Sequence, residues 1–514
     1  MDEKLNQFKD RPIAYFCAEY ALDSNLPIYA GGLGILAGDY MREAADQKVP
    51  IVGVGLFYNF NNSAKLNLAK NNQGNPLRIE VPIQDKKVKA QVFIYMIGSV
   101  PIYLLNTNVD ENDPVDRRIT HKLYPADKEI RLKQELVLGI GGLRTLEALK
   151  IHPLVYHLNE GHSAFLALEL VRHEMEERKI GFEAAIALSQ KRIVFTNHTL
   201  VATGSEVYSN DLVALMLTGY AQKLGVPVSE VVKLGLVQES STFSMTMLSL
   251  RLAGKVNAVS KLHAKRASDI WTDHPITTVT NGIHVGTWDK VKDLKNHGVC
   301  KQELLQFIQE QTHVKWELNQ LLLGWARRFV EYKRPLAILD NLERFLSITQ
   351  NTQYPVKIVF SGKSHENDEQ GKKLVQKLED LIKNKIGDCV VYLPKYNMEI
   401  AKKLVSGCDV WLNTPIVGFE ACGTSGMKAA LNGVLPCSTR DGWVDEAELY
   451  KMGWILDNDP LSENILDVLE QDIVPMYYQR PSEWQEHMQN ARAMVLNQFN
   501  TTRMLQEYIE KLYL

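Results

Sequence analysis

Short apolar runs, each leading into a loop and then a helical pattern, constrain the fold of this chain more than any other feature. The runs cover residues 13–20, 51–58, 100–108, 193–199, 356–363, 389–394 and 409–415. Runs this apolar are typical of strands that are buried on both faces of a parallel sheet. Helical periodicity occupies residues 129–149 and 161–178. Strands that alternate with helices predict an α/β fold, and 514 residues are too many for one hydrophobic core. We therefore expect two doubly wound, Rossmann-like domains that face each other across a cleft.

The boundary between the two domains is predicted near residues 281–290. The strand-like run ITTVTNG ends there and a charged segment begins. This places an N-terminal domain at residues 1–283 and a C-terminal domain at residues 284–514. The stretch from Ser482 onwards has a helical pattern, and its helices are the ones that can pack back on the first domain.

Composition and charge exclude several classes of protein. The net charge of −3 creates no general attraction for nucleic acid or an anionic membrane, so any phosphate site must be local. The six cysteines include no C-x-x-C pair, which argues against a zinc ribbon or a redox dithiol. His157 and His162 lack the spacing of a zinc-binding helix, and no metal is expected. No apolar run approaches the roughly 20 residues of a membrane helix. These features predict a cytoplasmic protein with reduced thiols.

Residues 420–433, EACGTSGMKAALNG, indicate a phosphate site beside a lysine. A glycine-rich turn at Gly423–Gly426 precedes a helix-like run, and the unpaired N–H groups at such a helix end favour phosphate. Lys428 lies about one turn further on. An amine next to a phosphate site is what pyridoxal phosphate requires, because the amine takes its aldehyde and the N–H groups take its phosphate. The alternative is a glycine turn with a surface lysine.

A second anion site is predicted in residues 321–335, LLLGWARRFVEYKRP. An apolar strand leads into a loop that holds Arg327, Arg328, Lys333 and Arg334. Pro335 is expected to be the first residue of a helix. Four cations beside a helix N-terminus suit a dianion, and arginine can grip phosphate through two parallel N–H bonds. The alternative is a solvated basic loop paired with Glu331.

Two weaker features complete the set of candidate ligand-binding motifs. The glycine-rich run YAGGLGILAG, at residues 29–38, allows a ligand to approach the backbone, although a tight packing turn explains it equally well. Polar residues also follow predicted strands in VYHLNEGH (155–162), TNHT (196–199) and VTNGIHVGTW (279–288). Their amide, carboxylate and imidazole groups are able to bind sugar hydroxyls, but a lone histidine is more often structural.

Taken in order along the chain, these motifs resemble the α-glucan (glycogen, starch or maltodextrin) phosphorylase family in its short form. The motifs that carry the resemblance are YAGGLGILAGDYM, LYPADKEIRLKQE, HLNEGH, TNHT, TNGIH, ARRFVEYKR and EACGTSGMKAALNGVL. The resemblance implies a glycosyltransferase-B fold and phosphorolysis of terminal α-1,4-glucosidic bonds to α-glucose 1-phosphate with retention. It also implies pyridoxal 5′-phosphate as a proton relay. Family members are often dimers, which makes a homodimer an expectation here.

The resemblance also implies roles for individual residues. Lys428, Arg328 and Lys333 would be catalytic. The pyridoxal phosphate would be bound by Lys428, Thr424, Ser425, Arg327, Lys333, Tyr396 and Trp288. The substrates, phosphate and glucan, would be bound by Gly32, Leu33, Asp127, Asn159, His198, Asn281, Glu420, Cys422 and Gly423, with Arg328 and Lys333 also on the phosphate.

The chain departs from the family pattern in several places. Cys422 stands where relatives often have serine, and Arg327 where some have lysine. Residues 59–75 do not match the usual aromatic and glutamine-rich stretch, which affects the expected preference for acceptor chains. The regulatory extension of the larger members is not recognised, so nucleotide and phosphorylation control are expected to be absent. Two alternatives stay open: a nucleotide-sugar glucosyltransferase of glycogen-synthase type, and an inactive glucan-binding protein. A glycoside hydrolase that uses Glu160 and Asp127 is a more distant one.

Overall fold

The computed structural model describes residues 2–58, 66–200, 206–237, 241–365 and 368–514. The chain divides into two compact units. Unit 1 comprises Met1–Val259, Ala264–Val279 and Leu505–Leu514, and unit 2 comprises Ser260–His263 and Thr280–Met504. The predicted division after residue 283 stays a prediction. Residues 59–65 of the atypical 59–75 segment lie outside the described residues.

Unit 1 is built on one large sheet. Its strands are β1 (Ile13–Phe16), β2 (Ile51–Leu56), β3 (Asn67–Leu68), β4 (Arg78–Ile83), β5 (Lys86–Ile97), β6 (Val100–Asn106), β7 (Val155–Asn159), β8 (Ile193–Asn197), β11 (Lys255–Ala258) and β12 (Ile276–Thr278). They lie in the order β12-β11-β8-β7-β1-β2-β6-β5-β3, and β4 pairs with β5. Pairing is parallel from β12 to β6 and antiparallel beyond it. The antiparallel edge was not predicted from the sequence.

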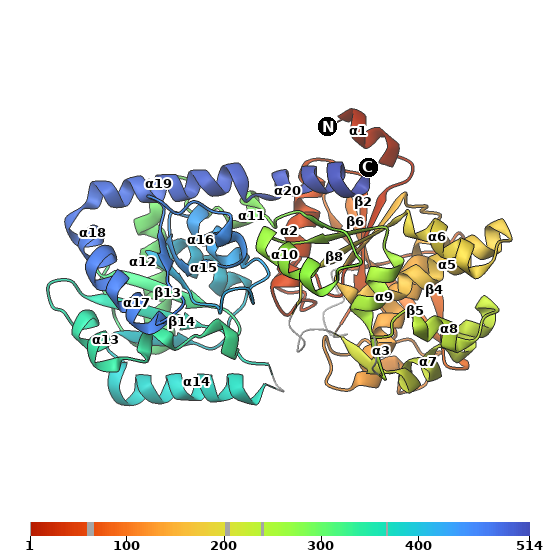
Figure 1. Cartoon of the computed structure of the whole chain (residues 1–514), viewed down its shortest axis with the longest axis horizontal. Coiled ribbons are helices and arrows are strands. Elements are labelled where there is room, and N and C mark those ends of the chain that lie inside the picture. The colour runs from red at the N-terminus through yellow and green to blue at the C-terminus, as the bar shows by residue number, and fades with distance from the viewer. Residues whose placement is uncertain (1, 59–65, 201–205, 238–240, 366–367) are drawn as a thin grey trace. The chain divides into compact units, whose positions relative to one another are not determined.

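The helices of this unit lie around its sheet, except that the short α1 stands apart from it in Figure 1. They are α1 (Asp2–Leu5), α2 (Gly32–Asp46), α3 (Lys128–Leu136), α4 (Gly142–Ala148), α5 (Phe165–Arg178), α6 (Phe182–Gln190), α7 (Asn210–Leu224), α8 (Val228–Lys233), α9 (Met245–Leu252) and α10 (Lys261–Ile270). A small antiparallel pair, β9 (Val207–Ser209) and β10 (Thr242–Ser244), stands apart from the sheet. The predicted helical stretches at 129–149 and 161–178 are confirmed, the first of them through a π-helical turn at Val137–Gly141.

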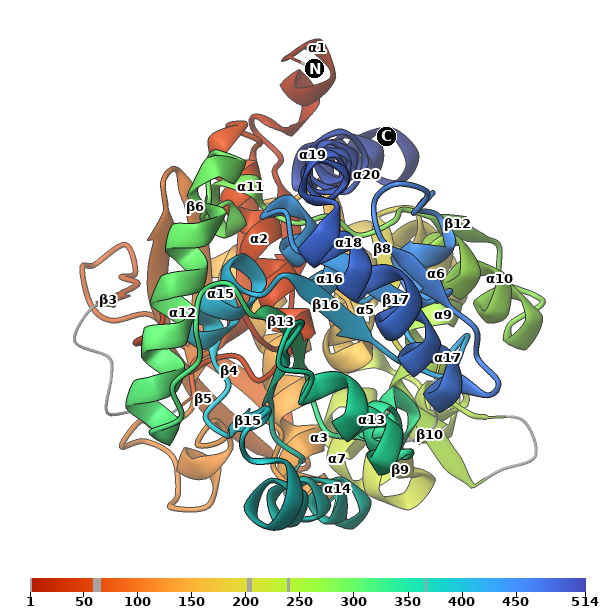
Figure 2. The ribbon, with the colours of Figure 1, turned by 90° about the vertical axis from the view of Figure 1, so that its left-hand side faces the viewer.

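Unit 2 has a smaller sheet with wholly parallel pairing. Its strands are β13 (Leu321–Ala326), β14 (Val356–Ser361), β15 (Val390–Leu393), β16 (Val410–Asn413), β17 (Leu435–Thr439) and β18 (Trp454–Leu456). They follow the order β15-β14-β13-β16-β17-β18, and β15, β13, β16 and β17 can be followed in Figure 2. Every residue of β13 is buried, which explains its unbroken apolar sequence. The α/β fold class and the doubly wound sheets are confirmed.

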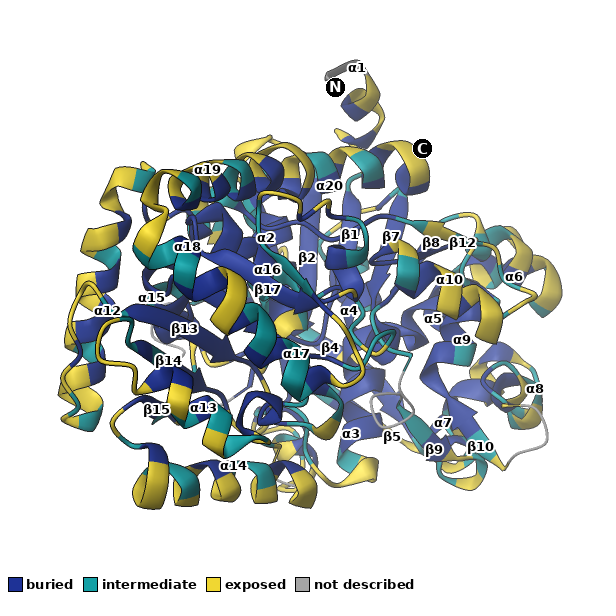
Figure 3. Cartoon of the chain, turned by 60° about the vertical axis from the view of Figure 1, so that its left-hand side comes forward, coloured by how far each residue is buried: buried dark blue, intermediate teal, exposed yellow. Residues whose placement is uncertain are grey.

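The helices of unit 2 lie on both faces of its sheet. They are α11 (Val285–Trp288), α12 (His297–Thr312), α13 (Leu342–Thr349), α14 (Glu369–Leu381), α15 (Met398–Gly407), α16 (Thr424–Leu431), α17 (Leu461–Val468), α18 (Val474–Gln479) and α19 (Pro481–Gln498). α20 (Thr501–Tyr508) follows α19, as the blue end of the ribbon in Figure 1 shows. Figure 3 shows the strands in the colour of buried residues and α14 with a largely exposed face. This contrast is the amphipathic pattern of a helix that covers a core.

The C-terminal residues complete the core of unit 1. The Tyr513 hydroxyl is 2.6 Å from the Tyr40 hydroxyl and 2.7 Å from Nδ1 of His157. The other ring nitrogen of His157, Nε2, is 2.7 Å from the Thr196 hydroxyl. Burial lowers the pKa of His157 to about 3, so its imidazole is neutral. His157, noted in the HLNEGH motif, therefore serves packing and hydrogen bonding inside unit 1.

Candidate active site

The strand order of unit 2 reverses between β13 and β16. Chain order runs outward from β13 to β15 on one side and from β16 to β18 on the other. In open α/β sheets, ligands bind beyond the carboxyl ends of the strands at such a reversal. Arg327 directly follows β13, and the loop after β16 leads to α16. The two predicted anion motifs therefore meet at one edge of this sheet.

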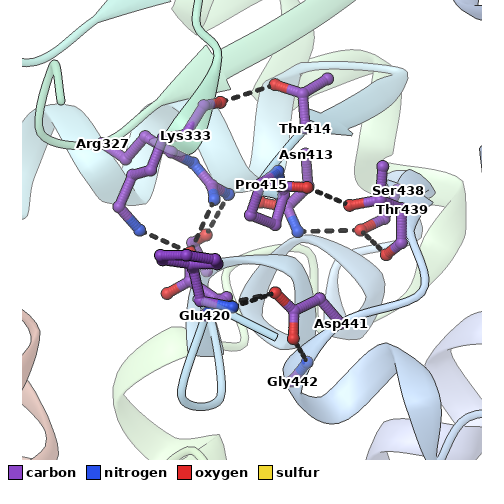
Figure 4. Close-up of polar contacts among 12 residues, drawn as sticks. Arg327, Lys333, Asn413, Thr414, Pro415, Glu420, Ser438, Thr439, Asp441 and Gly442 are labelled. Carbon is purple, nitrogen blue, oxygen red and sulfur yellow. Dashed lines mark hydrogen bonds and ion pairs between the residues drawn. The ribbon is translucent and has the colours of Figure 1, made fainter. Parts of the chain in front are cut away.

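A carboxylate holds two of the predicted cations together at this edge. Oε2 of Glu420 lies 2.5 Å from the Lys333 ammonium and 3.4 Å from Nη1 of Arg327. Nη2 of Arg327 donates to the Ser425 hydroxyl at 3.2 Å, in the first turn of α16. Figure 4 shows Arg327 and Lys333 converging on Glu420. Arg328 is exposed beside this group. The predicted alternative, a basic loop paired with Glu331, is not the arrangement that Arg327 and Lys333 adopt.

The electrostatics of this cluster favour a further anion. Burial alone would raise the pKa of Glu420, but Lys333 and Arg327 outweigh it and hold the pKa below its usual range. Burial also lowers the pKa of the Arg327 guanidinium, which Glu420 only partly opposes. Nε of Arg327 is enclosed and has no hydrogen-bond partner among the described residues. Three cations against one carboxylate thus leave an excess positive charge that suits a phosphate dianion.

Asp441 fixes the loop that carries Glu420, and sequence reasoning missed this residue. Its Oδ2 accepts hydrogen bonds from the backbone N–H groups of Phe419, at 3.1 Å, and Glu420, at 2.9 Å. Its Oδ1 accepts from Gly442 N at 2.8 Å, as Figure 4 shows. No motif surrounds Asp441 in the sequence, so only the fold reveals its role in placing the loop.

Two expectations for the 321–335 motif are wrong. Pro335 does not begin a helix: short 3-10 turns at Glu331–Lys333 and Ala337–Leu339 flank it, and the next α-helix starts at Leu342. The turn requires Arg334 to adopt a left-handed conformation, with φ of 44°. The Arg334 guanidinium donates to the carbonyl oxygens of Thr414, at 2.9 Å, and Pro415, at 2.7 Å. Arg334 therefore ties two loops together and is not part of the anion cluster.

Lys428 lies near the predicted phosphate-binding turn. α16 begins at Thr424, and Gly423 before it has φ of 80°, a left-handed conformation that favours glycine. The Lys428 ammonium donates to the Thr424 hydroxyl at 3.2 Å and lies 4.3 Å from the centre of the Trp288 ring. Lys428 and Trp288 are both buried. The structure confirms the predicted glycine turn, the helix that follows it and the position of Lys428 about one turn into that helix.

A buried amide, Asn432, links these groups. Its Nδ2 donates to the carbonyl oxygens of Trp288 and Lys428, both at 2.8 Å. Gly426, in the first turn of the helix, sits against Trp443: a Cβ there would lie 3.1 Å from the indole. The local sequence thus holds the lysine, the aromatic ring and the turn in a fixed arrangement.

Other predicted residues of unit 2 surround this cluster. Tyr396 follows β15 and acts electrostatically on Arg327. Cys422 is buried, which raises the pKa of its thiol, so it is neutral. Asn281 is buried, and its Oδ1 has no hydrogen-bond partner among the residues that the structure describes. An unpartnered buried amide oxygen is costly unless a ligand or water satisfies it.

Unit 1 has its own reversal of strand order, between β1 and β7. Nδ2 of Asn159, the last residue of β7, donates to Cys17 Sγ at 3.2 Å. Oδ1 of Asn159 is 2.7 Å from Nε2 of His198. Oε2 of Glu160 accepts from the backbone N–H of His198 at 2.8 Å. Predicted residues Asn159 and His198 are therefore in direct contact, and Glu160 fixes the backbone of His198.

The glycine-rich turn of unit 1 lies beside Glu19. Oε2 of Glu19 accepts from the N–H groups of Ala30, at 2.6 Å, and Gly31, at 3.0 Å, so Glu19 is an anchor that sequence reasoning missed. α2 begins at Gly32, followed by Leu33. The first N–H groups of a helix have no partner inside that helix and suit an anion.

Asp127 and a neighbouring cluster have structural partners. The Asp127 side chain caps α3 by accepting from Glu129 N and Ile130 N.

Elsewhere in unit 1, Glu135, His162 and Glu206 each offer one possible metal ligand atom, all within 4.8 Å of one another. Arg131 forms ion pairs with Glu135 and Glu206, so a cation already compensates them. The prediction that no metal is bound stays a prediction.

Comparison with known proteins gives matches along most of the chain. The sequence model of a family described as carbohydrate phosphorylase matches residues 106–291 and 285–448. A maltodextrin phosphorylase of Thermococcus litoralis is 34% identical over 98% of this chain and 70% of its own length. A glycogen phosphorylase of Aquifex aeolicus is 32% identical, covering 98% and 86% of the two chains, and one of Mycobacterium tuberculosis is 32% identical, covering 98% and 70%. Over the part of the chain that the structure describes, no helix is both long and apolar enough to span a membrane.

Proposed function

Because this chain belongs to the carbohydrate phosphorylase family, we propose that it is an α-glucan phosphorylase that uses pyridoxal 5′-phosphate. The proposed reaction cleaves a terminal α-1,4-glucosidic bond with inorganic phosphate and releases α-glucose 1-phosphate with retained configuration. The family resemblance inferred from the sequence motifs is confirmed by the matches. The proposal for the reaction is supported most by one observation: the cation cluster of Arg327 and Lys333 lies against the first turn of the helix that carries Lys428.

The residues of unit 2 fit the cofactor. A buried amine at Lys428 is held over the Trp288 ring, where it is placed to take the cofactor's aldehyde. The N-terminal turn of α16 offers N–H groups to the cofactor's phosphate, and Arg327 points its guanidinium at the same turn through Ser425. When bound, pyridoxal phosphate supplies its 5′-phosphate as a group that relays a proton.

The protein's own task is to hold a second phosphate close to the first. Like charges a few ångströms apart repel by several kcal/mol at intermediate dielectric, so the site needs fixed cations. Lys333, Arg328 and the unpartnered Nε of Arg327 provide them. Because these donors are placed before the substrate arrives, they stabilise the charge that develops during cleavage without reorganising. Glu420 keeps the cations in position.

Polar groups at strand ends would bind the sugar. In unit 2, Asn281 would accept a hydrogen bond from a sugar hydroxyl, and this role is supported by its buried Oδ1, which has no partner among the described residues. In unit 1, His198 and Asn159 form a fixed imidazole–amide pair of the kind that binds sugar hydroxyls. We assign the N-terminus of α2, at Gly32 and Leu33, to the substrate phosphate. Asp127 is proposed to act near the sugar only through α3, which it caps.

The test is to replace Lys428 by alanine and by arginine. Both variants should lose the absorbance band of the bound cofactor and the phosphate-dependent release of glucose 1-phosphate, because neither side chain can bond to the aldehyde. Arginine keeps the cation over Trp288, so it separates attachment from charge. Lys451→Ala, which changes an exposed lysine of the same unit, serves as the control and should behave as wild type.

Three results would redirect the assignment. Full phosphorolysis by both Lys428 variants would exclude this lysine as the cofactor's attachment point. Turnover of ADP-glucose or UDP-glucose without pyridoxal phosphate would instead favour a nucleotide-sugar glucosyltransferase. Glucan binding with no turnover of either kind would identify an inactive glucan-binding protein.

A further inference from the structure

One large apolar side chain lies exposed beside the cation cluster of Arg327 and Lys333. Phe419 is 44% exposed and directly precedes Glu420, whose carboxylate holds the cluster together. In the part of the chain that the structure describes, the exposed aromatic residues are Phe419 and Tyr450. Single exposed apolar residues are common and need no explanation by themselves. The fixed backbone of Phe419 and its place next to the cluster distinguish it.

The loop that carries Phe419 is held by hydrogen bonds. It comprises residues 414–423, between β16 and α16. The backbone N–H of Phe419 lies 3.1 Å from the Ile416 carbonyl oxygen and 3.1 Å from Asp441 Oδ2. Gly418 has φ of 91°, a left-handed conformation that allows the turn directly before Phe419. The backbone therefore presents the phenyl ring from a defined position.

Tyr332 supports the ring of Phe419. The two ring centres are 6.1 Å apart, and the ring planes are inclined by 30°. Aromatic rings attract each other at centre distances of about 4.5–7 Å. The N–H of Ile416 also donates to the Tyr332 carbonyl oxygen at 2.8 Å, so the two loops are joined through their backbones. Tyr332 thus restricts the orientations that are open to the Phe419 ring.

The same tyrosine connects the aromatic pair with the cations. The Lys333 ammonium lies 5.0 Å from the centre of the Tyr332 ring, within the range of a cation–π contact, and 2.5 Å from Glu420 Oε2. A charged region that suits phosphate therefore continues directly into an apolar aromatic surface. A ligand that uses both regions has an apolar face next to the group that meets the phosphate.

A sugar ring has such a face. The ring hydroxyls of a glucopyranose unit are equatorial, so its axial C–H bonds form two faces that are largely apolar. The hydrogens of these faces carry a small positive charge and are attracted to the negative face of an aromatic ring. A phosphate gains nothing from an uncharged phenyl ring, which offers it neither charge nor a hydrogen bond. The exposed ring of Phe419 therefore suits the glucan and not a phosphate.

We propose that Phe419, supported by Tyr332, is a platform on which a sugar ring of the glucan stacks during phosphorolysis. The inference rests on the proposed function, because it assigns a part of that same site to the glucan. The platform is held in place before the glucan arrives, so little conformational entropy is lost on binding. Phe419 determines the affinity for the glucan and takes no part in proton transfer.

The test compares Phe419→Ala, Phe419→Tyr and Tyr450→Ala with wild type in steady-state phosphorolysis. Maltoheptaose is varied at saturating phosphate, and phosphate is varied at saturating maltoheptaose. Phe419→Ala should raise the KM for maltoheptaose about tenfold and change the KM for phosphate by less than about twofold. Phe419→Tyr keeps the flat ring and should stay near wild type. Tyr450→Ala removes the other exposed aromatic side chain of unit 2 and should behave as wild type.

The two KM values separate stacking from a purely structural role. If Phe419 only held its loop, its loss would displace Glu420 and the cations that Glu420 holds, so the KM for phosphate would rise as well. An equal rise in both KM values would therefore overturn the inference. An unchanged KM for maltoheptaose in Phe419→Ala would also overturn it. Either result leaves the proposed function standing, because wild type still releases glucose 1-phosphate.

Direct binding tests the platform if wild type gives no phosphorolysis and the proposed function fails. Maltoheptaose is then titrated into each protein by isothermal calorimetry. Phe419→Ala should raise the Kd about tenfold, and Tyr450→Ala should leave it unchanged. Equal binding by wild type and Phe419→Ala, or no binding by wild type, would overturn the platform.

Discussion

Replacing Glu160 by glutamine is expected to remove a pH-dependent loss of stability from unit 1. Glu160 is buried at the end of β7, and burial raises the pKa of its carboxyl from 4.5 to about 7, although hydrogen bonds from His198 N and Gly161 N oppose the shift. Between these two pH values the folded chain keeps a proton that the unfolded chain has released. Stability therefore falls as the pH rises, by about 1.4 kcal/mol per pH unit and about 3 kcal/mol in total. Above about pH 7 this contribution no longer changes.

The measurement is hydrogen exchange by mass spectrometry on peptides that cover β7 and β8, from pH 5 to pH 8. Local exchange is needed because seven of the eight tryptophans lie in unit 2, where fluorescence would report the wrong unit. The opening free energy of wild type should fall with pH relative to Glu160→Gln, by about 3 kcal/mol. Glu174→Gln is the control: its paired carboxyl has a lowered pKa, so removing it should leave the fall with pH the same as in wild type. Parallel wild-type and Glu160→Gln profiles would refute the reasoning.

Three further predictions concern unit 2. Arg328→Ala should raise the KM for phosphate at least tenfold and that for glucan little, and equal effects in steady-state kinetics would argue against its role. Lys301→Met should lower the free energy of unfolding by about 3–5 kcal/mol, because it leaves Asp409 buried without its partner; denaturation followed by tryptophan fluorescence measures this. Gly282→Ala should destabilise by about 3 kcal/mol or more in the same assay, since its Cβ would lie 2.2 Å from the Asn500 carbonyl oxygen; a variant as stable as wild type would contradict that geometry.

The regular parts of the fold were predictable because their sequence patterns are local. The apolar runs that became β13 and β16, and the turn before Lys428, need only periodicity and the backbone preferences of glycine. The reversal of strand order then explains why two separate motifs meet at one edge.

The errors came where distant contacts decide the local structure. Pro335 fits the start of a helix by sequence, but Arg334 takes a left-handed turn there and donates to carbonyl groups 80 and 81 residues away. Asp441 and Glu19 were missed for the same reason. Each holds a loop through backbone N–H groups, and no sequence spacing marks that role.

The return of residues 505–514 to unit 1 has a consequence for synthesis. Tyr513 and Tyr508 reach the hydrogen-bonded group around His157 and Thr196, far earlier in the sequence. During translation these tyrosines emerge from the ribosome only after all of unit 2 has been made. A nascent chain that stops at residue 279 therefore lacks the hydroxyl partner of His157 Nδ1, although Thr196 is already present for Nε2. Unit 1 completes its core last, although most of its residues are made first.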